Sequence, residues 1–252
     1  MERSMNIDVL FENDDVCVIN KPSGVSVHKD GRREEDTVAD WFVTQYPESS
    51  GVGEPLLLTD GGTVERHGIV HRLDKETSGV MILAKTQDAF EKLKEQFQAR
   101  SVSKIYRLFV SGEIQEASGV IDKAIGRSRG NFRLRSAEFG AKPPLRDAQT
   151  NFSVLARGGG YSYVEATPKT GRMHQLRVHF KARGNPIVCD RLYMPRRECA
   201  LGFSRLALHA HSLAIYLPNG EFMTFMAPLP EDFKNAEQVV RTTPPITPER
   251  EP

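Results

Sequence analysis

One carboxylate stands among basic residues in a short polar segment that separates two apolar stretches. Residues 71–79 read HRLDKETSG, with Asp74 close to Arg72 and Lys75. An ionised carboxylate can stabilise positive charge that develops on a carbon atom, or it can bond covalently to that atom. When such a group is partly buried, it stays ionised at neutral pH only if a cation lies near it. These residues predict a reactive carboxylate at Asp74, kept charged by a basic partner.

Two other interpretations apply to the same kinds of residue. An isolated loop aspartate commonly bonds nearby backbone groups and does no chemistry. Histidines can ligate a metal ion, but here none stands in an HExxH pattern or with a carboxylate at ligand spacing. We therefore expect no metal site. The histidines concerned are His67, His71, His174, His179, His209 and His211.

The elements that position Asp74 follow from the periodicity of the apolar residues. We expect strands over residues 68–73 and 79–84, so that the polar segment forms a loop between them. Residues 48–63 contain four glycines and little periodicity, which predicts a mobile surface loop. Further strands are expected over residues 15–20, 104–110 and 131–135, and hairpins over residues 148–156 with 161–167 and 206–216 with 221–226. Helices are expected over residues 37–46, 86–100 and 172–183.

Strands and helices do not alternate regularly, which favours an α+β domain over a doubly wound sheet. Neither GxxxxGK[ST] nor GxGxxG occurs, so no nucleotide-binding loop is predicted. We expect one catalytic domain over residues 6–235 of the 252. Residues 236–252 are polar and rich in proline, which predicts a disordered tail.

Net charge and cysteine content limit the possible partners and compartment. The formal net charge is only +1, so the molecule as a whole is not strongly cationic. Cys17, Cys189 and Cys199 show no CxxC spacing and support neither a disulfide framework nor a cysteine-rich zinc site. No apolar run approaches the roughly 18 residues that span a bilayer, and the first residues lack an apolar signal core. We expect a cytoplasmic protein without membrane contact.

Basic residues are concentrated in residues 126–146, where Glu138 is the single acidic residue. Such a segment either forms a local surface that attracts phosphates or is a solvated strand face. The basic residues are Arg127, Arg129, Arg133, Arg135, Lys142 and Arg146.

The segment HRLDKETSG resembles the HRLDxxTSG signature of the RluA-type pseudouridine synthases. Four further blocks agree in order: FENDDVCVINKPSGVSVH, SKIYRLFVSG, ATPKTGRMHQLRVHF and RLALHAHSLAIYLP. The resemblance covers roughly residues 6–233, without the N-terminal S4 domain that many relatives carry. It implies the pseudouridine synthase fold, a twisted, mainly antiparallel mixed sheet with peripheral helices and a central cleft.

The resemblance also implies roles for particular residues. Asp74 is the essential nucleophile, Arg177 forms an ion pair with it, and Tyr106 is a catalytic residue that stacks on the target base and can serve in proton transfer. Leu176 supports the base from its other side, and Arg72 fills the space left when the uridine swings out of the RNA. The remaining residues assigned to substrate binding are His71 and His174, which order the site by hydrogen bonding, and Arg172.

The implied reaction is the isomerisation of uridine to pseudouridine in ribosomal or transfer RNA, with no cofactor. Whether the aspartate adds to the base or to the sugar stays open, as does the target uridine. No obligate protein partner is evident, and a monomer is the default. The alternatives are a non-catalytic RNA-binding or ribosome-assembly factor on the same fold, and a metal-dependent hydrolase that uses the histidines.

Two positions depart from the family pattern. Where the family commonly has PIVGD followed by YG, this chain has Cys189 before Asp190 and Met194 after Tyr193. We interpret these residues as altered packing or backbone geometry near the RNA surface, which would affect substrate preference more than catalysis.

Overall fold

The computed structural model describes residues 5–29, 35–57, 63–131, 134–138 and 140–246. The chain divides into two compact units. The first unit consists of Met1–Lys104 and Ala210–Pro228, and the second of Ile105–His209 and Leu229–Pro252. Asp74 therefore belongs to the first unit, and Tyr106 and Arg177 belong to the second.

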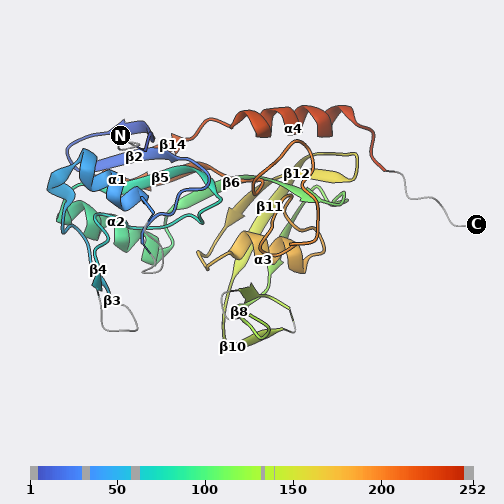
Figure 1. The fold of residues 1–252 in the computed structure, drawn as a ribbon, viewed down its shortest axis with the longest axis horizontal. Helices are drawn as coiled ribbons and strands as arrows, with labels where there is room; N and C mark the ends of the chain where they lie inside the picture. The colour runs from blue at the N-terminus through green and yellow to red at the C-terminus, as the bar shows by residue number, and fades with distance from the viewer. Residues whose placement is uncertain (1–4, 30–34, 58–62, 132–133, 139, 247–252) are drawn as a thin grey trace, which may run out of the picture. The chain divides into compact units, whose positions relative to one another are not determined.

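The first unit is built on strands in the order β1, β2, β5 and β13, with β14 paired to β13 (Figure 1). β2 is antiparallel to both β1 and β5. Every residue of β5 is buried, as are all but one of β2, which explains their continuous apolar sequences. The bounds are β1 Asp8–Glu12, β2 Val16–Lys21, β5 Ser78–Ala84, β13 Leu208–Tyr216 and β14 Phe222–Met226.

Both helices of the first unit begin where the sequence predicts. The N-cap of α1 (Val38–Gln45) is Thr37, which forms a reciprocal capping box with Asp40. The N-cap of α2 (Gln87–Ala99) is Thr86, whose hydroxyl accepts from an N–H in the first turn. α2 buries the apolar face formed by Ala89, Phe90 and Leu93.

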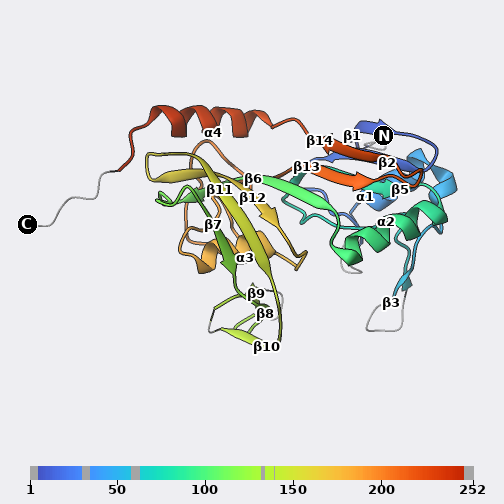
Figure 2. The same ribbon diagram turned by 180° about the vertical axis from the view of Figure 1, so that it is seen from behind.

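The second unit contains the strand order β6, β12, β11 and β7, seen from behind in Figure 2. β12 pairs antiparallel with both β6 and β11, β11 pairs antiparallel with β7, and β11 and β12 form the predicted hairpin. A separate three-stranded sheet has the order β10, β8, β9. The bounds are β6 Ser103–Ser111, β7 Ser118–Asp122, β8 Ile125–Ser128, β9 Arg135–Ser136, β10 Ala141–Arg146, β11 Gln149–Gly158 and β12 Tyr161–Pro168.

Two helices, α3 (Gln175–Ala182) and α4 (Glu231–Thr242), complete the second unit. Their buried aromatic residues join a core in which Phe109 stacks on Tyr163 with ring centroids 4.5 Å apart. α4 packs closely on the end of β11, because a Cβ added at Gly158 would lie 2.4 Å from the Val240 carbonyl oxygen. Glycine is therefore required at this crossing.

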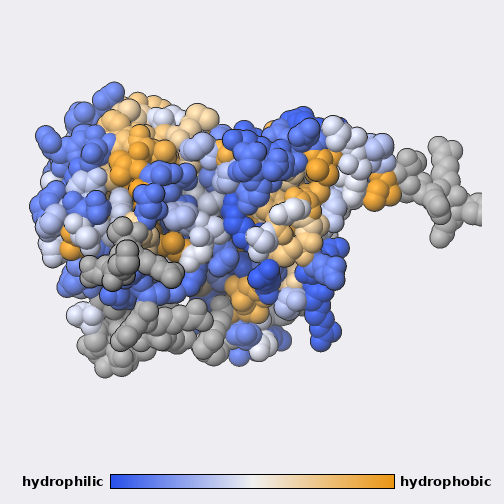
Figure 3. All heavy atoms as spheres, turned by 45° about the horizontal axis from the view of Figure 1, so that its top comes forward, coloured by the Kyte–Doolittle hydropathy of each residue, from blue (hydrophilic) through white to orange (hydrophobic). Residues whose placement is uncertain are grey.

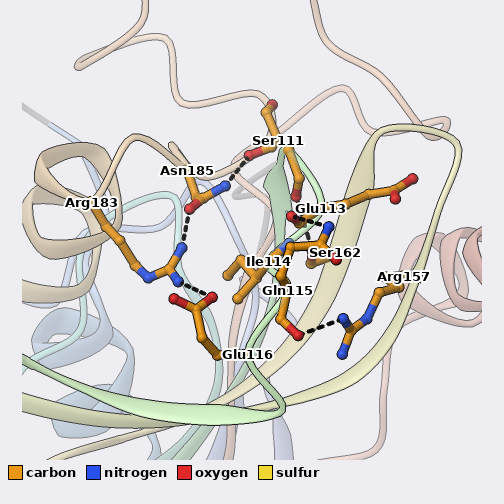
Figure 4. A network of polar contacts seen from close by, with 10 residues as sticks. Ser111, Glu113, Ile114, Gln115, Glu116, Arg157, Ser162, Arg183 and Asn185 are labelled. Carbon is orange, nitrogen blue, oxygen red and sulfur yellow. Dashed lines mark hydrogen bonds and ion pairs between the residues drawn. The ribbon is translucent and has the colours of Figure 1, made fainter. Parts of the chain in front are cut away.

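A network of polar contacts fixes the loop between β6 and β7 to the C-terminal end of α3 (Figure 4). Arg183 donates to Glu116 Oε2 at 2.7 Å and to the side chain of Asn185. Asn185 Nδ2 in turn donates to the Ser111 carbonyl at 3.0 Å. Ser162 Oγ accepts from the Ile114 N–H at 2.8 Å. These bonds hold the helix that carries Arg177 against the sheet.

Two predicted elements are wrong. Residues 68–73 do not form a strand: only Ile69 makes an isolated bridge, to Leu83. The positive φ of Gly68, +72°, and the close approach of its backbone to Ala84 prevent a continuous strand. The predicted disordered tail begins too early, because α4 extends to Thr242 and buries Ala236 and Val240. Its strongly polar composition concealed that narrow apolar face.

Other expectations need smaller corrections. The predicted loop over residues 48–63 contains a 3-10 turn, Pro47–Ser49, and a short pair of strands, β3 (Leu56–Leu57) and β4 (Thr63–Val64), while residues 58–62 lie outside the described residues. The strand predicted over residues 131–135 includes residues 132 and 133, which also lie outside the described residues, and the observed strand is β9. α3 begins three residues later than predicted, because His174 has a left-handed backbone with φ +56°.

The sulfur atoms of Cys189 and Cys199 form a disulfide, although the spacing of the cysteines gave no reason to expect one. Cys17 is a free, buried thiol. Both cysteines lie in the irregular segment that follows α3, and the turns of this segment bring them together. The expectation that no disulfide forms is therefore wrong.

On the face drawn in Figure 3, hydrophilic residues predominate and hydrophobic residues gather in separate areas. The exposed large hydrophobic residues come from several elements, with Val9 on β1 and Phe222 and Met226 on β14 among them. Among the described helices, none has both the length and the apolar character needed to cross a membrane.

Candidate active site

Asp74 lies in a tight turn that leads directly into the buried strand β5. Its carbonyl oxygen accepts from the Thr77 N–H at 3.0 Å, which closes the turn. Asp74 itself is half-buried, while Thr77 and Ser78 are buried. The carboxylate is therefore carried by a segment whose C-terminal end is fixed in a sheet.

A buried lysine holds the other side of this turn. Lys21, at the end of β2, has no exposed surface. Its Nζ donates to the carbonyl oxygens of Pro22 at 2.8 Å, Val25 at 2.7 Å and Lys75 at 3.1 Å. An ammonium group has three N–H donors, enough for one bond to each of these carbonyls. Lys21 ties the residue that follows Asp74 to the segment that follows β2.

Two further bonds join these segments. The Gly24 N–H donates to the Lys75 carbonyl at 2.8 Å, and Ser23 Oγ donates to the Glu76 carbonyl at 2.6 Å. Lys75 Nζ also pairs with Glu35 Oε2 at 2.6 Å. The backbone around Asp74 is thus held by several independent contacts, which restricts where its carboxylate can lie.

Gly79 allows the strand after the turn to enter the sheet. Its φ is +119°, and an added Cβ would lie 2.1 Å from the Ala210 carbonyl oxygen. No side chain fits at that distance, so the glycine of the TSG sequence is required sterically.

His71 orders the segment before Asp74. Its Nε2 accepts from the Ile82 N–H at 3.1 Å, and its ring stacks on Phe97 with centroids 4.5 Å apart. Burial lowers the pKa of His71 to about 3, and the charge of Lys104 acts in the same direction. The imidazole is therefore neutral at physiological pH and accepts a hydrogen bond from the backbone of β5.

Arg72 points a different way. It is exposed, and its Nη1 lies 3.3 Å from His28 Nε2. An exposed guanidinium next to a half-buried carboxylate leaves a cation on the surface of this segment.

In the second unit, Tyr106 lies on β6 opposite Ala166 of β12. It is half-buried and packs against the hydrophobic core that contains Leu176. Leu176 is 6% exposed, so it contributes to the edge of that core. The structure thus brings the two residues predicted to hold the base to the same core.

Arg177 is buried in the first turn of α3 and forms a bidentate ion pair with Asp190. Its Nε lies 2.9 Å from Oδ2 and its Nη2 lies 2.6 Å from Oδ1. Both side chains are almost fully buried, at 5% and 1% exposed. Asp190 also accepts from the N–H groups of Leu192 at 3.2 Å and Tyr193 at 3.1 Å. Buried charges require this degree of pairing, because burying either charge alone is costly.

The residues around Arg177 are equally well bonded. His174 Nδ1 lies 2.7 Å from the Tyr193 hydroxyl, which accepts from the Arg135 N–H at 3.0 Å. Arg172 Nε donates to the Asp147 carbonyl at 3.0 Å. His174 and Arg172 therefore hold the loop before α3 in place.

The predicted residues fall into two sets. His71, Arg72 and Asp74 share one segment of the first unit, and Tyr106, Arg172, His174, Leu176 and Arg177 belong to the second unit. The ion pair between Asp74 and Arg177 stays a prediction.

The sequence did not assign Lys21 and Asp190, the two residues that hold the turn and the arginine. In the sequence, Lys21 ends an apolar strand directly before Pro-Ser-Gly, and this position could have indicated that Lys21 holds a turn. For Asp190 no signal in the sequence pointed to Arg177. Among the described residues, no group of three or more His, Cys, Asp or Glu side chains could hold a metal ion.

A family model described as RNA pseudouridylate synthase matches residues 15–182, a range that contains both Asp74 and Arg177. This chain belongs to the RNA pseudouridylate synthase family. It is accordingly an isomerase that acts on RNA, and the RluA-type family assignment made from the HRLDKETSG segment is confirmed.

Curated relatives cover most of this chain. An uncharacterized RNA pseudouridine synthase of Synechocystis is 34% identical over 92% of this chain and 68% of its own length. A protein of Neisseria meningitidis named ribosomal large subunit pseudouridine synthase D is 39% identical over 94% of this chain and 62% of its own length. The chain thus spans about two thirds of the length of these relatives.

Two solved human structures have the same fold. They are the RNA pseudouridylate synthase domain containing proteins 4 and 1, each with a TM-score of 0.69 and 26% identity. The alignments cover 94% and 98% of this chain, and 94% and 100% of the human chains. The α+β pseudouridine synthase fold predicted from the sequence is confirmed.

Proposed function

We propose that this protein converts one or more uridines of large-subunit ribosomal RNA to pseudouridine, with Asp74 as its catalytic carboxylate. Two relatives named ribosomal large subunit pseudouridine synthase D support this choice of RNA. The one from Neisseria meningitidis is 39% identical, and the one from Pseudomonas aeruginosa is 35% identical over 92% of this chain and 71% of its own length.

The observation that carries the proposal is the way the turn at Asp74 is held. Lys21, Gly24 and Ser23 fix the carbonyls of Lys75 and Glu76, while Thr77 and Ser78 are buried at the start of β5. A catalytic group on such a turn is already oriented before RNA binds, so little of the binding energy is spent on ordering it. A turn aspartate that only capped local backbone would not need this support.

The reaction is an isomerisation, so the substrate gains and loses no atoms overall. The bond between C1′ of ribose and N1 of uracil breaks, the detached base turns, and C5 bonds to C1′. The proton that leaves C5 is balanced by the proton gained at N1. In this scheme Asp74 forms the transient bond or stabilises the positive charge that develops on the sugar as the first bond breaks.

Arg177 fits the role of the cation that keeps Asp74 ionised. A guanidinium carries five N–H donors in a rigid fork, and the pair with Asp190 uses one at Nε and one at Nη2. One arginine can therefore serve two carboxylates, with Asp190 setting its orientation. We propose that Asp74 is the second carboxylate.

Tyr106 and Leu176 fit the role of a support for the everted uracil. Both border one hydrophobic core, and Tyr106 is only half-buried. Stacking of a base on an aromatic ring contributes about 1–3 kcal/mol, which offsets part of the cost of unstacking the uridine. Arg72 is exposed beside Asp74 and fits the role of filling the vacated space in the RNA.

The deciding experiment measures pseudouridine formed in an unmodified large-subunit ribosomal RNA transcript by the purified protein. We expect product with the wild type and none with Asp74→Ala. For Arg177→Met we expect RNA binding to survive while turnover falls by a factor of roughly a hundred or more, as for loss of a preorganised electrostatic contact. Product from Asp74→Ala at the wild-type rate would refute the catalytic assignment.

The same experiment separates the enzyme from a non-catalytic RNA-binding factor. Such a factor would bind the transcript without forming pseudouridine, and its binding would not depend on Asp74. Product on transfer RNA but not on ribosomal RNA would leave the chemistry intact and correct the target.

A further inference from the structure

The segment that holds Arg177 is closed by a covalent bond. Cys189 and Cys199 form a disulfide across ten positions of the chain. The residues between them form turns without a regular helix or strand, and six of them are exposed, namely Arg191, Leu192, Pro195, Arg196, Arg197 and Glu198. We call the segment from Cys189 to Cys199 the clasp loop.

The inward-facing residues of the clasp loop contact both the first turn of α3 and the residue before it. Asp190 binds Arg177 through two hydrogen bonds. Tyr193 binds His174 through its hydroxyl, and the Arg177 guanidinium carbon lies 5.1 Å from the centroid of its ring. The position of Arg177 therefore depends on where the clasp loop lies.

Few bonds other than the disulfide define the outer part of the clasp loop. Backbone hydrogen bonds within the loop are local: the N–H groups of Arg191, Met194 and Arg197 donate to the carbonyls of Cys189, Asp190 and Met194, respectively. Its start is fixed to the sheet, because Val188 donates to the Phe109 carbonyl at 2.9 Å. Cys199 is half-buried and packs against the hydrophobic core of the second unit. Without the cross-link, this packing and local turns would have to hold that end of the loop, and segments with few long-range hydrogen bonds open at low free-energy cost.

The backbone at Cys189 also indicates that the cross-link matters. Its φ is +58°, in the left-handed region that favours glycine. The family pattern commonly has glycine at this position, so in this chain a cysteine occupies a conformation that disfavours its side chain. Contacts made by that side chain offset the disadvantage: Cys189 is buried in the hydrophobic core and is bonded to Cys199.

We propose that the Cys189–Cys199 disulfide is a positioning cross-link that keeps Asp190 and thereby Arg177 in the orientation needed for turnover, so that reducing it slows the enzyme. This rests on the proposed role of Arg177. The disulfide is reduced by a dithiol. One thiolate of the dithiol attacks a cysteine sulfur to give a mixed disulfide, and its second thiolate then attacks the mixed disulfide and releases that cysteine as a thiol. The protein gains two electrons and two protons as two thiols, and the reductant leaves as a cyclic disulfide.

The test compares the full chain, purified without reductant, before and after treatment with dithiothreitol. Alkylation and mass spectrometry establish whether the bond is present and then cleaved. We expect kcat for uridine isomerisation to fall by roughly tenfold to a hundredfold on reduction, with KM little changed, because misplacing a catalytic group costs turnover more than binding. Hydrogen exchange of the Leu192 and Tyr193 amides should accelerate at the same time.

Variants separate positioning from general destabilisation. Cys189→Gly removes the bond while suiting the positive φ, so it should fold, show low kcat and be insensitive to dithiothreitol. Cys17→Ser removes the remaining thiol and should respond like the wild type. In Asp190→Asn the route to Arg177 is already broken, so reduction should lower kcat much less than in the wild type.

Several results would overturn the proposal. The first is free thiols at Cys189 and Cys199 in protein purified without reductant, and the second is an unchanged kcat after proven cleavage. The third is a loss of kcat on reduction that is as large in Asp190→Asn as in the wild type. Unchanged amide exchange in the clasp loop after cleavage would overturn it as well. If no pseudouridine forms in either state, the proposed function on that RNA fails, and the exchange measurement still decides whether the disulfide holds the loop.

Discussion

Replacing Lys21 with methionine tests whether one buried ammonium holds the turn of Asp74. Methionine is similar in length and unbranched, so Lys21→Met removes the charge without leaving a large cavity. The carbonyl oxygens of Pro22, Val25 and Lys75 then lose a donor that lies within 3.1 Å of each of them.

The expected loss follows from these three bonds. A hydrogen bond to a charged group contributes about 1.5–3 kcal/mol, and an unsatisfied buried acceptor costs about 1–3 kcal/mol. The variant also avoids the cost of burying an ammonium, so the three losses do not add in full. We expect the free energy of unfolding to fall by about 3–5 kcal/mol, as for removing one partner from a buried ionic contact.

Urea unfolding measured by tryptophan fluorescence is a suitable assay. The chain has one tryptophan, Trp41, which is buried in α1 of the same unit as Lys21. With a slope of about 2 kcal/mol per molar urea, the midpoint should fall by about 2 M while the slope is unchanged. Pseudouridine formation should fall as well, because the turn of Asp74 loses its support.

Lys92→Met provides the matched control, since Lys92 is exposed on α2, where its Nζ pairs with Asp88 and donates to the Pro218 carbonyl at the surface. Its midpoint should equal that of the wild type. If Lys21→Met unfolds at the same urea concentration as this control, Lys21 does not hold the turn, and the argument from its burial is wrong.

Two further predictions concern the same segment. Gly79→Ala should lower the free energy of unfolding by about 2–4 kcal/mol, because its Cβ would lie 2.1 Å from the Ala210 carbonyl oxygen, and Gly130→Ala, whose Cβ would meet nothing within 4 Å, should not. Thermal unfolding of the two variants checks this, and equal stability of the two would contradict it. The unfolded chain protonates His71 below about pH 6.5, whereas the folded protein does so only near its lowered pKa of about 3. The free energy of unfolding should therefore keep its full contribution from His71 above pH 6.5 and fall by about 1.4 kcal/mol per pH unit below it. In urea titrations from pH 7 to pH 4, His71→Gln should lack this part of the dependence on pH.

The sequence predicted the elements that are defined by local patterns. α2 has a capping threonine and an apolar face at spacings of three and four, and β11 with β12 has two alternating strands joined at glycines. The strand predicted over residues 68–73 failed because a positive φ at Gly68 and a single bridge at Ile69 replace regular pairing. Sequence periodicity does not contain the backbone contact with Ala84 that produces this geometry.

The same division applies to the candidate site. The segment HRLDKETSG identified the family and pointed to Asp74, because chemistry of this kind requires particular residue types in a fixed local order. The partner of Arg177 within the second unit, Asp190, lies thirteen positions further along the chain in a loop without periodicity. A bidentate pair at that separation depends on how α3 and the clasp loop pack together.

The sequence by itself predicted the class of fold and, through the resemblance of HRLDKETSG to a family signature, the family and its reaction. The same resemblance pointed to Asp74 as the catalytic carboxylate, which stays a prediction. The tertiary structure decided what holds that residue and its neighbours in place: the ammonium of Lys21 under the turn, the carboxylate of Asp190 against Arg177, and the bond between Cys189 and Cys199. These contacts join segments distant in the sequence or lie in irregular loops. They arise because buried charges and carbonyls must find partners wherever the packed chain places them.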